Sequence, residues 1–144
     1  MKRALLLALG LLAGCGEFPR DASGTSRAIA ERGHIRVGIT ADTGVLPQES
    51  ARGRALLARL GAPAIVERGP TEPLLVQLEE GELDLVLTPL TRDSAWATRV
   101  SLGPSIADAD IAGSRHELRP AVRNGENALI GRVYRAAMAI GGRE

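Results

Sequence analysis

The chain has 144 residues, which allows one domain of ordinary size rather than two. Its 18 basic and 17 acidic residues give a formal net charge of +1, and no basic block stands out, which excludes the charge pattern of a nucleic-acid-binding protein. Aromatic residues make up only 2% of the chain, too few for a surface that stacks single-stranded bases. The single cysteine excludes an intramolecular disulfide and a cysteine-rich zinc site, and two histidines without His-x-x-x-His spacing predict no metal site.

The first fifteen residues have the pattern of an export signal. Two basic residues precede a nine-residue apolar run at 4–12, which is too short to cross about 30 Å of hydrocarbon but has the length of a signal-peptide core. The run leads into the sequence LAGC at 12–15, which resembles the bacterial lipobox, where a peptidase cleaves before a cysteine that receives a diacylglyceryl group. We therefore predict a lipoprotein signal peptide at 1–14 and lipidation of Cys15. The alternatives are an ordinary secretory signal with an incidental cysteine and a buried N-terminal helix.

The segment that follows, 15–26, is rich in Gly, Ser, Pro and charged residues, a composition typical of a tether. Lipidation of Cys15 makes the membrane a partner, because each buried CH₂ of an acyl chain contributes about 0.8 kcal/mol. Gly16, rather than Asp, follows the cysteine, which by resemblance to enterobacterial sorting favours the outer membrane over the inner. Residues 27–144 are then predicted to form one domain in the cell envelope, facing the periplasm.

In that domain the hydrophobic pattern alternates between helix and strand. Ser26 and Thr71 are candidate N-caps, and Pro73 in a first helical turn loses little because its missing N–H has no intrahelical partner there. The nearly continuous apolar run 83–87 is expected of a central parallel strand buried on both faces. The predicted helices are 26–32, 48–60, 71–80, 91–98 and 126–140, and the predicted strands are 35–40, 64–67, 83–87, 100–102 and 118–123.

The remaining segments are predicted as loops and turns. Residues 41–48 and 103–117 are polar or small and are predicted as loops. Pro120 has no N–H to donate, so we expect strand 118–123 to lie at an edge or a bulge of the sheet, and strand 100–102 to be an edge strand. Strand–helix alternation with short connections predicts a three-layer α/β sandwich with a mostly parallel sheet.

Four stretches carry a family resemblance: RGHIRVGIT at 32–40, ALLARLGA at 55–62, LEEGELDLVLTPLT at 78–91 and AVRNGENAL at 121–129. In this order they resemble the bacterial extracellular solute-binding proteins of family 3, the periplasmic receptors of amino-acid importers. The resemblance covers residues 27–140. It implies a periplasmic-binding-protein-like fold, a small-molecule solute as ligand and a membrane transporter of the ABC class as partner.

Two departures from the family change this expectation. Members have two lobes, and the second is inserted where this chain has only residues 104–118, so the chain resembles the first lobe alone and cannot trap a solute by hinge closure as a monomer. The family also grips the ligand carboxylate with an arginine at a position that is Trp96 here, which removes a bidentate clamp. Arg92 and Arg99 flank that position out of register. The aromatic residue on which the family stacks its ligand is missing as well, since 41–47 contains none.

Candidate ligand-binding residues follow from topology, because ligands meet the carboxyl ends of strands in open α/β sheets. Thr40 and Asp42 follow the first strand, and Thr88 and Thr91 follow the central one, where Thr88 matches the ligand-touching Ser or Thr of the family. Trp96, the only tryptophan, is a candidate recognition anchor at the same edge. The alternatives are capping or turn chemistry for the threonines, an Asx-turn for Asp42, and a core or surface filler for Trp96.

Catalysis has little support, because the chain lacks the G-x-S-x-G pattern of a strained nucleophile turn. His34 and His116 are expected in solvated loops. We therefore predict a non-enzyme without a cofactor. One hypothesis is a binding module that holds a small solute or presents it to a membrane transporter. The other is an interaction lipoprotein whose strand-end face docks a membrane transporter, another partner or a second copy, and a degenerate enzyme is a third hypothesis.

Overall fold

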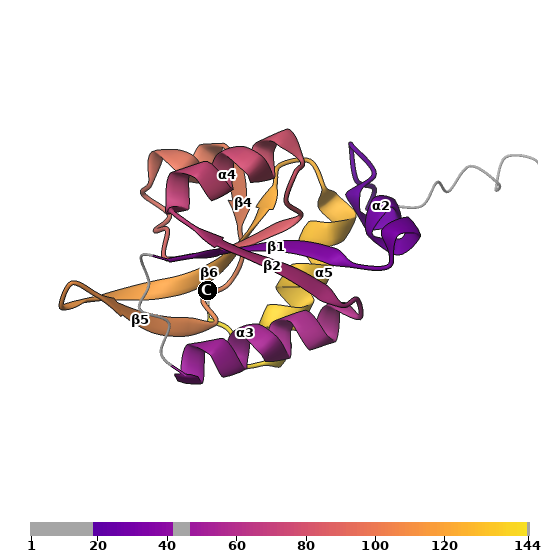
Figure 1. The fold of residues 1–144 in the computed structure, drawn as a ribbon. Coiled ribbons are helices and arrows are strands. Elements are labelled where there is room, and N and C mark those ends of the chain that lie inside the picture. The colour runs from indigo at the N-terminus through magenta and orange to yellow at the C-terminus, as the bar shows by residue number, and fades with distance from the viewer. Residues whose placement is uncertain (1–18, 42–46, 144) are drawn as a thin grey trace, which may run out of the picture.

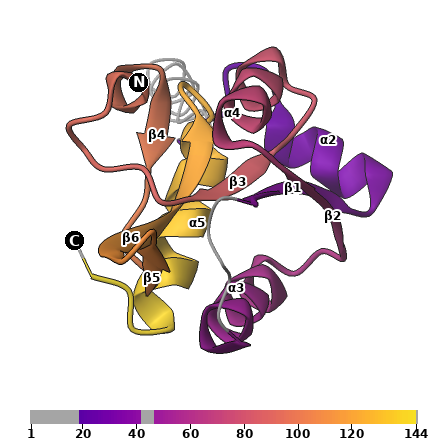
Figure 2. The same cartoon turned by 60° about the vertical axis from the view of Figure 1, so that its left-hand side comes forward.

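The computed structural model describes residues 19–41 and 47–143, in which a sheet lies between two layers of helices. Helix α4 (Thr71–Glu80) covers one face, and α3 (Pro47–Leu60) and α5 (Asn127–Ala139) cover the other (Figure 1), a separation that Figure 2 shows from a second direction. Helix α2 (Thr25–Arg32) packs beside α5. Within the described ranges, no helix is long and apolar enough to cross a membrane. The predicted signal peptide, Cys15 and Asp42 lie outside the described residues.

The sheet confirms the predicted α/β sandwich. Its strands are β1 (Ile35–Thr40), β2 (Ala64–Gly69), β3 (Leu85–Thr88), β4 (Val100–Leu102), β5 (Ala107–Ile111) and β6 (Ser114–Arg123). They lie in the order β2-β1-β3-β6-β4, and β5 pairs with β6. Strands β1, β2 and β3 are parallel, and β6 runs against β3, β4 and β5, so β6 is the one reversed strand among those described. As predicted, β3 is central and fully buried and β4 is an edge strand.

Alternating side chains of the sheet divide the core in two. Leu85 and Leu87 join the cluster under α3 and α5, whereas Val86 joins the cluster under α4. A β-carbon built on Gly38 would lie 2.9 Å from Leu83 Cδ1 and 3.2 Å from Leu74 Cδ2, so the bare backbone of β1 is what lets the leucines of the α4 layer pack this closely.

The predicted loop 103–117 is wrong, because β5 and the start of β6 form a hairpin there. Ala107 and Ala109 are buried, and Asp108 and Asp110 are more exposed, which is the two-residue period of a strand. The sequence hides this strand because its buried positions are alanine, which has a low strand propensity. The two-residue turn has φ of 52° at Ala112 and 80° at Gly113, the conformation of a type I′ turn. Ala-Gly lacks the Asn-Gly signature that announces such a turn in a sequence.

The expectation that Pro120 confines its strand to an edge or bulge is also wrong, since β6 lies between β3 and β4. In an extended strand the N–H and C=O of one residue point to the same flank. The carbonyl of Pro120 accepts from the Gly103 N–H (2.8 Å), on the flank where β4 has ended at Leu102 and β5 has not begun. A residue other than proline at position 120 would direct its backbone N–H toward the Gly103 carbonyl. Here that carbonyl accepts a hydrogen bond from the Arg119 guanidinium instead (3.0 Å). The missing donor therefore costs no bond to β3.

The other helices and strands lie where the sequence predicts them, apart from their ends. The predicted helix 91–98 is only a 3₁₀ turn, η2 (Ala95–Thr98). Gly24 and Pro70, rather than Ser26 and Thr71, occupy the N-cap positions of α2 and α4. His116 is a half-buried strand residue opposite Ala109 instead of a solvated loop residue.

Candidate ligand-binding site

The carboxyl ends of β1 and β3 place two of the predicted site residues side by side. The register aligns Ile39 with Leu87, so Thr40 and Thr88 end the two strands together, and both are fully buried. Strand β6 brings Arg119 directly opposite Thr88. We call Thr40, Thr88 and Arg119 the strand-end site. Arg119 was not predicted, because it joins the site only through the antiparallel pairing of β6 with β3.

The Thr88 hydroxyl is the distinctive group of the strand-end site. Its oxygen is buried and has no hydrogen-bond partner among the described residues, so the side chain makes neither a helix cap nor a turn bond there. A buried hydroxyl without a partner costs about 1–3 kcal/mol. Thr88 therefore carries a buried hydroxyl whose hydrogen-bonding capacity is unused among the described residues at the end of the central strand.

Arg119 is a buried arginine that is already engaged. Its side chain is 5% exposed, donates to the Gly103 carbonyl (3.0 Å) and pairs with the Glu117 carboxylate (2.5 Å). These contacts fix the guanidinium against the sheet and neutralise its charge locally. It is thus a poor candidate for the clamp that the family provides.

Thr91 is exposed, and Trp96 is half-buried against the cluster under α4. The Arg99 guanidinium lies 4.2 Å from the centroid of the Trp96 ring and is ion-paired with Glu79. This packing favours the alternative in which Trp96 fills the edge of the core. The prediction that Trp96 lies at the same edge as Thr88 is wrong, because η2 leads into the start of β4, which pairs with Arg123 at the opposite edge of the sheet.

Neither flanking arginine restores the clamp. Arg99 is held by Trp96 and Glu79, and Arg92 lines a cavity of about 280 Å³ beside the edge strand β4, together with Asn124. In the part of the chain that the structure describes, no group of three or more His, Cys, Asp or Glu side chains could hold a metal ion.

Comparison with known proteins gives matches among solved structures, whereas no protein-family model and no curated protein sequence matches the chain. An arginine-bound mutant of domain 1 of TmArgBP, the T. maritima arginine-binding protein, matches with a TM-score of 0.65 at 19% identity, over 81% of this chain and 98% of that one. Arginine-bound domain 1 of TmArgBP matches with a TM-score of 0.62 at 20% identity, over 78% and 97%. A Salmonella typhimurium periplasmic binding protein with high arginine specificity matches with a TM-score of 0.59 at 10% identity, over 74% and 92%.

The chain has the fold of a single lobe of a periplasmic solute-binding protein. This is the fold that the sequence resemblance implied. In this lobe the β5–β6 hairpin occupies the segment where the resemblance expected a second lobe to be inserted. Among the described residues, no second lobe consequently faces the strand-end site.

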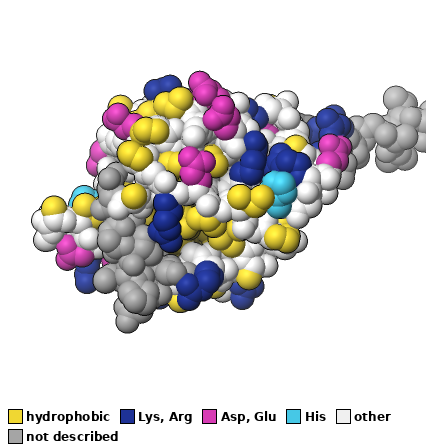
Figure 3. Space-filling view, viewed as in Figure 1, with side chains coloured by type: hydrophobic (Ala, Val, Ile, Leu, Met, Phe, Trp, Pro, Cys, Tyr) yellow, Lys and Arg dark blue, Asp and Glu magenta, His cyan; other side chains and the backbone are white. Residues whose placement is uncertain are grey.

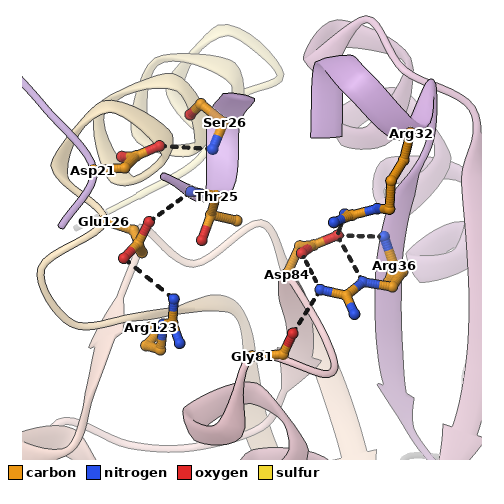
Figure 4. A network of polar contacts seen from close by, with 9 residues as sticks. All are labelled: Asp21, Thr25, Ser26, Arg32, Arg36, Gly81, Asp84, Arg123 and Glu126. Atoms are coloured by element: carbon orange, nitrogen blue, oxygen red, sulfur yellow. Dashed lines mark hydrogen bonds and ion pairs between the residues drawn. The ribbon is translucent and has the colours of Figure 1, made fainter. Parts of the chain in front are cut away.

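The opposite edge of the lobe carries a buried ion cluster (Figure 4). Asp84 is 2% exposed, and its carboxylate accepts from Arg32 Nη2 (2.6 Å), Arg36 Nη2 (2.8 Å) and the Arg36 backbone N–H (2.8 Å). The three residues belong to two of the stretches that carry the family resemblance. Those stretches are thus joined by one carboxylate just before β3.

Two further carboxylates cap the helices of the same edge crosswise. Glu126, fully buried before α5, accepts from the backbone N–H groups of Ser23 (2.8 Å) and Thr25 (3.0 Å) at the start of α2. Asp21, before α2, accepts from Ala128 (2.7 Å) and Leu129 (3.0 Å) at the start of α5. Each helix therefore receives an N-terminal acceptor from the chain that precedes the other, and Asp21 also accepts from the Ser26 N–H of α2 (2.8 Å).

The pKa values of both carboxyls follow from burial and from the hydrogen bonds that they accept, from Ser26, Leu129 and Ala128 in the case of Asp21 and from Thr25 and Ser23 in the case of Glu126. Burial alone raises the pKa of Asp21 and of Glu126, but the hydrogen bonds that they accept favour the ionised form and leave both pKa values below the ordinary range. The same hydrogen bonds concern the predicted tether 15–26, because they join its last part, from Asp21 onward, to Glu126 and α5 of the lobe. The domain boundary at 27 stays a prediction.

Proposed function

We propose that the protein is a lipid-anchored, solute-binding module of the cell envelope, which holds or presents a small polar solute at the strand-end site. The observation that carries the proposal is the Thr88 hydroxyl, buried and unpartnered at the carboxyl end of the central strand. The fold supports the proposal, since the matched structures are of proteins named for binding arginine, which are binding proteins rather than enzymes.

The solute that we propose is uncharged. A free α-amino acid brings a carboxylate, and desolvating a carboxylate without a cationic partner costs several kcal/mol. Arg119 is occupied by Glu117 and Gly103, and Trp96, which replaces the family's arginine in the sequence, lies at the opposite edge of the sheet. We therefore expect ordinary amino acids, including arginine, to bind no better than millimolar, and neutral polar or aromatic solutes to bind more tightly.

A calorimetric titration tests this function. The twenty amino acids and a panel of neutral solutes are added, and the heat of binding is measured directly, because Trp96, the only tryptophan, lies at the opposite edge of the sheet from Thr88. A solute present at 100 times its dissociation constant should also stabilise the fold by about 2.7 kcal/mol in a thermal-shift assay. Thr88→Val removes the hydroxyl at constant shape and should abolish both responses. The matched control is Thr98→Val, which removes an exposed hydroxyl that donates to the Ala95 carbonyl in the native chain. This variant should keep both responses.

The outcomes separate the hypotheses. Micromolar binding of glutamine, arginine or glutamate would contradict the argument about the missing clamp. No response to any solute would contradict solute binding and favour the second candidate, a lipoprotein that docks a membrane transporter, another partner or a second copy through the strand-end face. The docking function is supported by the β5–β6 hairpin, which occupies the segment where a second lobe was expected, so no second lobe covers this face among the described residues.

A further inference from the structure

The described chain begins close to its predicted anchor. Asp21 is fixed to the lobe through its bonds to the start of α5, and Cys15 lies only six residues earlier. Six residues span at most about 20 Å when fully extended. If Cys15 carries the lipid, Asp21 is held within about that distance of the bilayer surface.

Asp21 and the strand-end site lie at opposite edges of the sheet. Asp21 is bridged to Glu126, just beyond Arg123 at the end of β6, and because β6 is antiparallel this end lies beside the starts of β1 and β3. Figure 1 shows α2 at one end of the molecule and the β5–β6 hairpin at the other. A domain of about 120 residues has a radius of gyration of about 13–14 Å and is therefore about 35 Å across, which is more than the anchor segment can span.

We propose that the α2 end of the lobe faces the membrane that holds Cys15, and that the strand-end site opens away from this membrane. The proposal rests on the lipid anchor of the proposed function. The short anchor segment, rather than charge, sets this orientation. Charges of both signs lie together around α2 (Figure 3), where Arg27 is 3.7 Å from Glu31, so this end has no single-sign surface that would attract a charged membrane. A solute or a protein partner consequently reaches the site from the aqueous side, and a protein partner projects well above this bilayer or belongs to the opposing membrane.

Engineered cysteines test the orientation. The lipid consumes the only native thiol, so a new cysteine can be labelled uniquely in the purified lipoprotein, reconstituted in vesicles that carry an acceptor dye on the lipid headgroups. Arg27→Cys labels α2, where the native side chain is 82% exposed, and Ser114→Cys labels the exposed start of β6 in the hairpin. Energy transfer to the membrane should be at least about twofold higher from position 27 than from position 114, given the difference in distance.

A longer tether is the matched control. Insertion of about 20 Gly and Ser residues after Gly16 allows the lobe to turn over, and the two labels should then transfer energy equally. Equal or reversed transfer in the chain with its native tether would overturn the proposed orientation. A protein that does not float with the vesicles would instead refute the lipid anchor, and with it the premise of the orientation.

Discussion

At the scale of the residue, one buried carboxylate joins α2 to the sheet. Asp84 takes charge-assisted hydrogen bonds from Arg32, the last residue of α2, and from Arg36 on β1. Both arginines are about 30% exposed at the side chain, so each keeps part of its hydration while the carboxylate keeps almost none. The cluster therefore depends more on Asp84 than on either arginine.

We predict that Asp84→Ala lowers the free energy of unfolding by about 2–4 kcal/mol, because two charged donors lose a shared buried acceptor. Urea denaturation at pH 7 measures the change. Glu82→Ala, an exposed carboxylate two residues earlier, is the matched control and should change stability by less than about 0.5 kcal/mol. Equal effects of the two substitutions would show that the cluster contributes nothing specific.

The sequence places some of these residues and misses others for a physical reason. Thr40 and Thr88 can be assigned to strand ends because the apolar runs before them are local patterns. Arg119, Asp21 and Glu126 have no local signature, because each acts through a residue that is distant in the chain or through a strand pairing. Only the three-dimensional arrangement identifies them.

At the scale of the element, the hairpin turn is suboptimal for its conformation. Ala112 has a φ of 52°, in the left-handed region that residues with a β-carbon rarely adopt. We predict that Ala112→Asn raises the free energy of unfolding by about 0.5–1 kcal/mol, since Asn tolerates this region, and that Gly113→Ala lowers it by about 1 kcal/mol. Thermal denaturation measures both. A change of the same sign in the two variants would contradict the type I′ assignment.

The crossed caps of α2 and α5 predict a pH dependence. The folded pKa values of Asp21 and Glu126 lie below the unfolded values of 3.8 and 4.5, so these carboxylates stabilise the fold above the unfolded values. That contribution is lost as the pH falls from these values through the folded ones. Glu126→Gln should lower stability at pH 7 and flatten the acid limb of a denaturation series between pH 7 and pH 2.

The control for this series is Glu31→Gln, a side chain that is 71% exposed on α2 and makes no cap. It should keep the stability at pH 7 and the full acid limb. If Glu126→Gln shows the same acid limb as the native chain, the crossed caps are not the source of the pH dependence.

Periodicity decides which elements can be predicted. Helix α5 buries Leu129, Val133 and Ala136, spaced as the sequence predicts for one face of a helix. Strand β5 escapes prediction because alanine and aspartate build its alternation. The strand 118–123 is predicted but its central place is not, because proline argues against a central strand until the gap opposite Pro120 is known. Long apolar repeats are visible in a sequence, whereas pairing partners are not.

At the scale of the whole molecule, the proposed lipid anchor would decide where the lobe works. We predict that radiolabelled palmitate enters the native chain in a bacterial host, and that Cys15→Ser abolishes the label because the chain has no other thiol. Ser26→Cys in the Cys15→Ser background supplies a thiol outside the lipobox and should stay unlabelled. Equal labelling of the native chain and Cys15→Ser would contradict the anchor.

The crossed caps also bear on when the chain can fold. Glu126 accepts from the Ser23 N–H across 103 residues, and Asp21 accepts from the Leu129 N–H across 108, so several bonds at the start of the first described helix form only with the last one. Contacts of such sequence separation form late, since a long loop must close before they contribute. A nascent chain that has not yet released its final helix thus lacks the bonds that fasten its beginning. This order of events suits the export that the N-terminal sequence predicts, because contacts that close last leave less of the structure formed while the chain crosses the membrane.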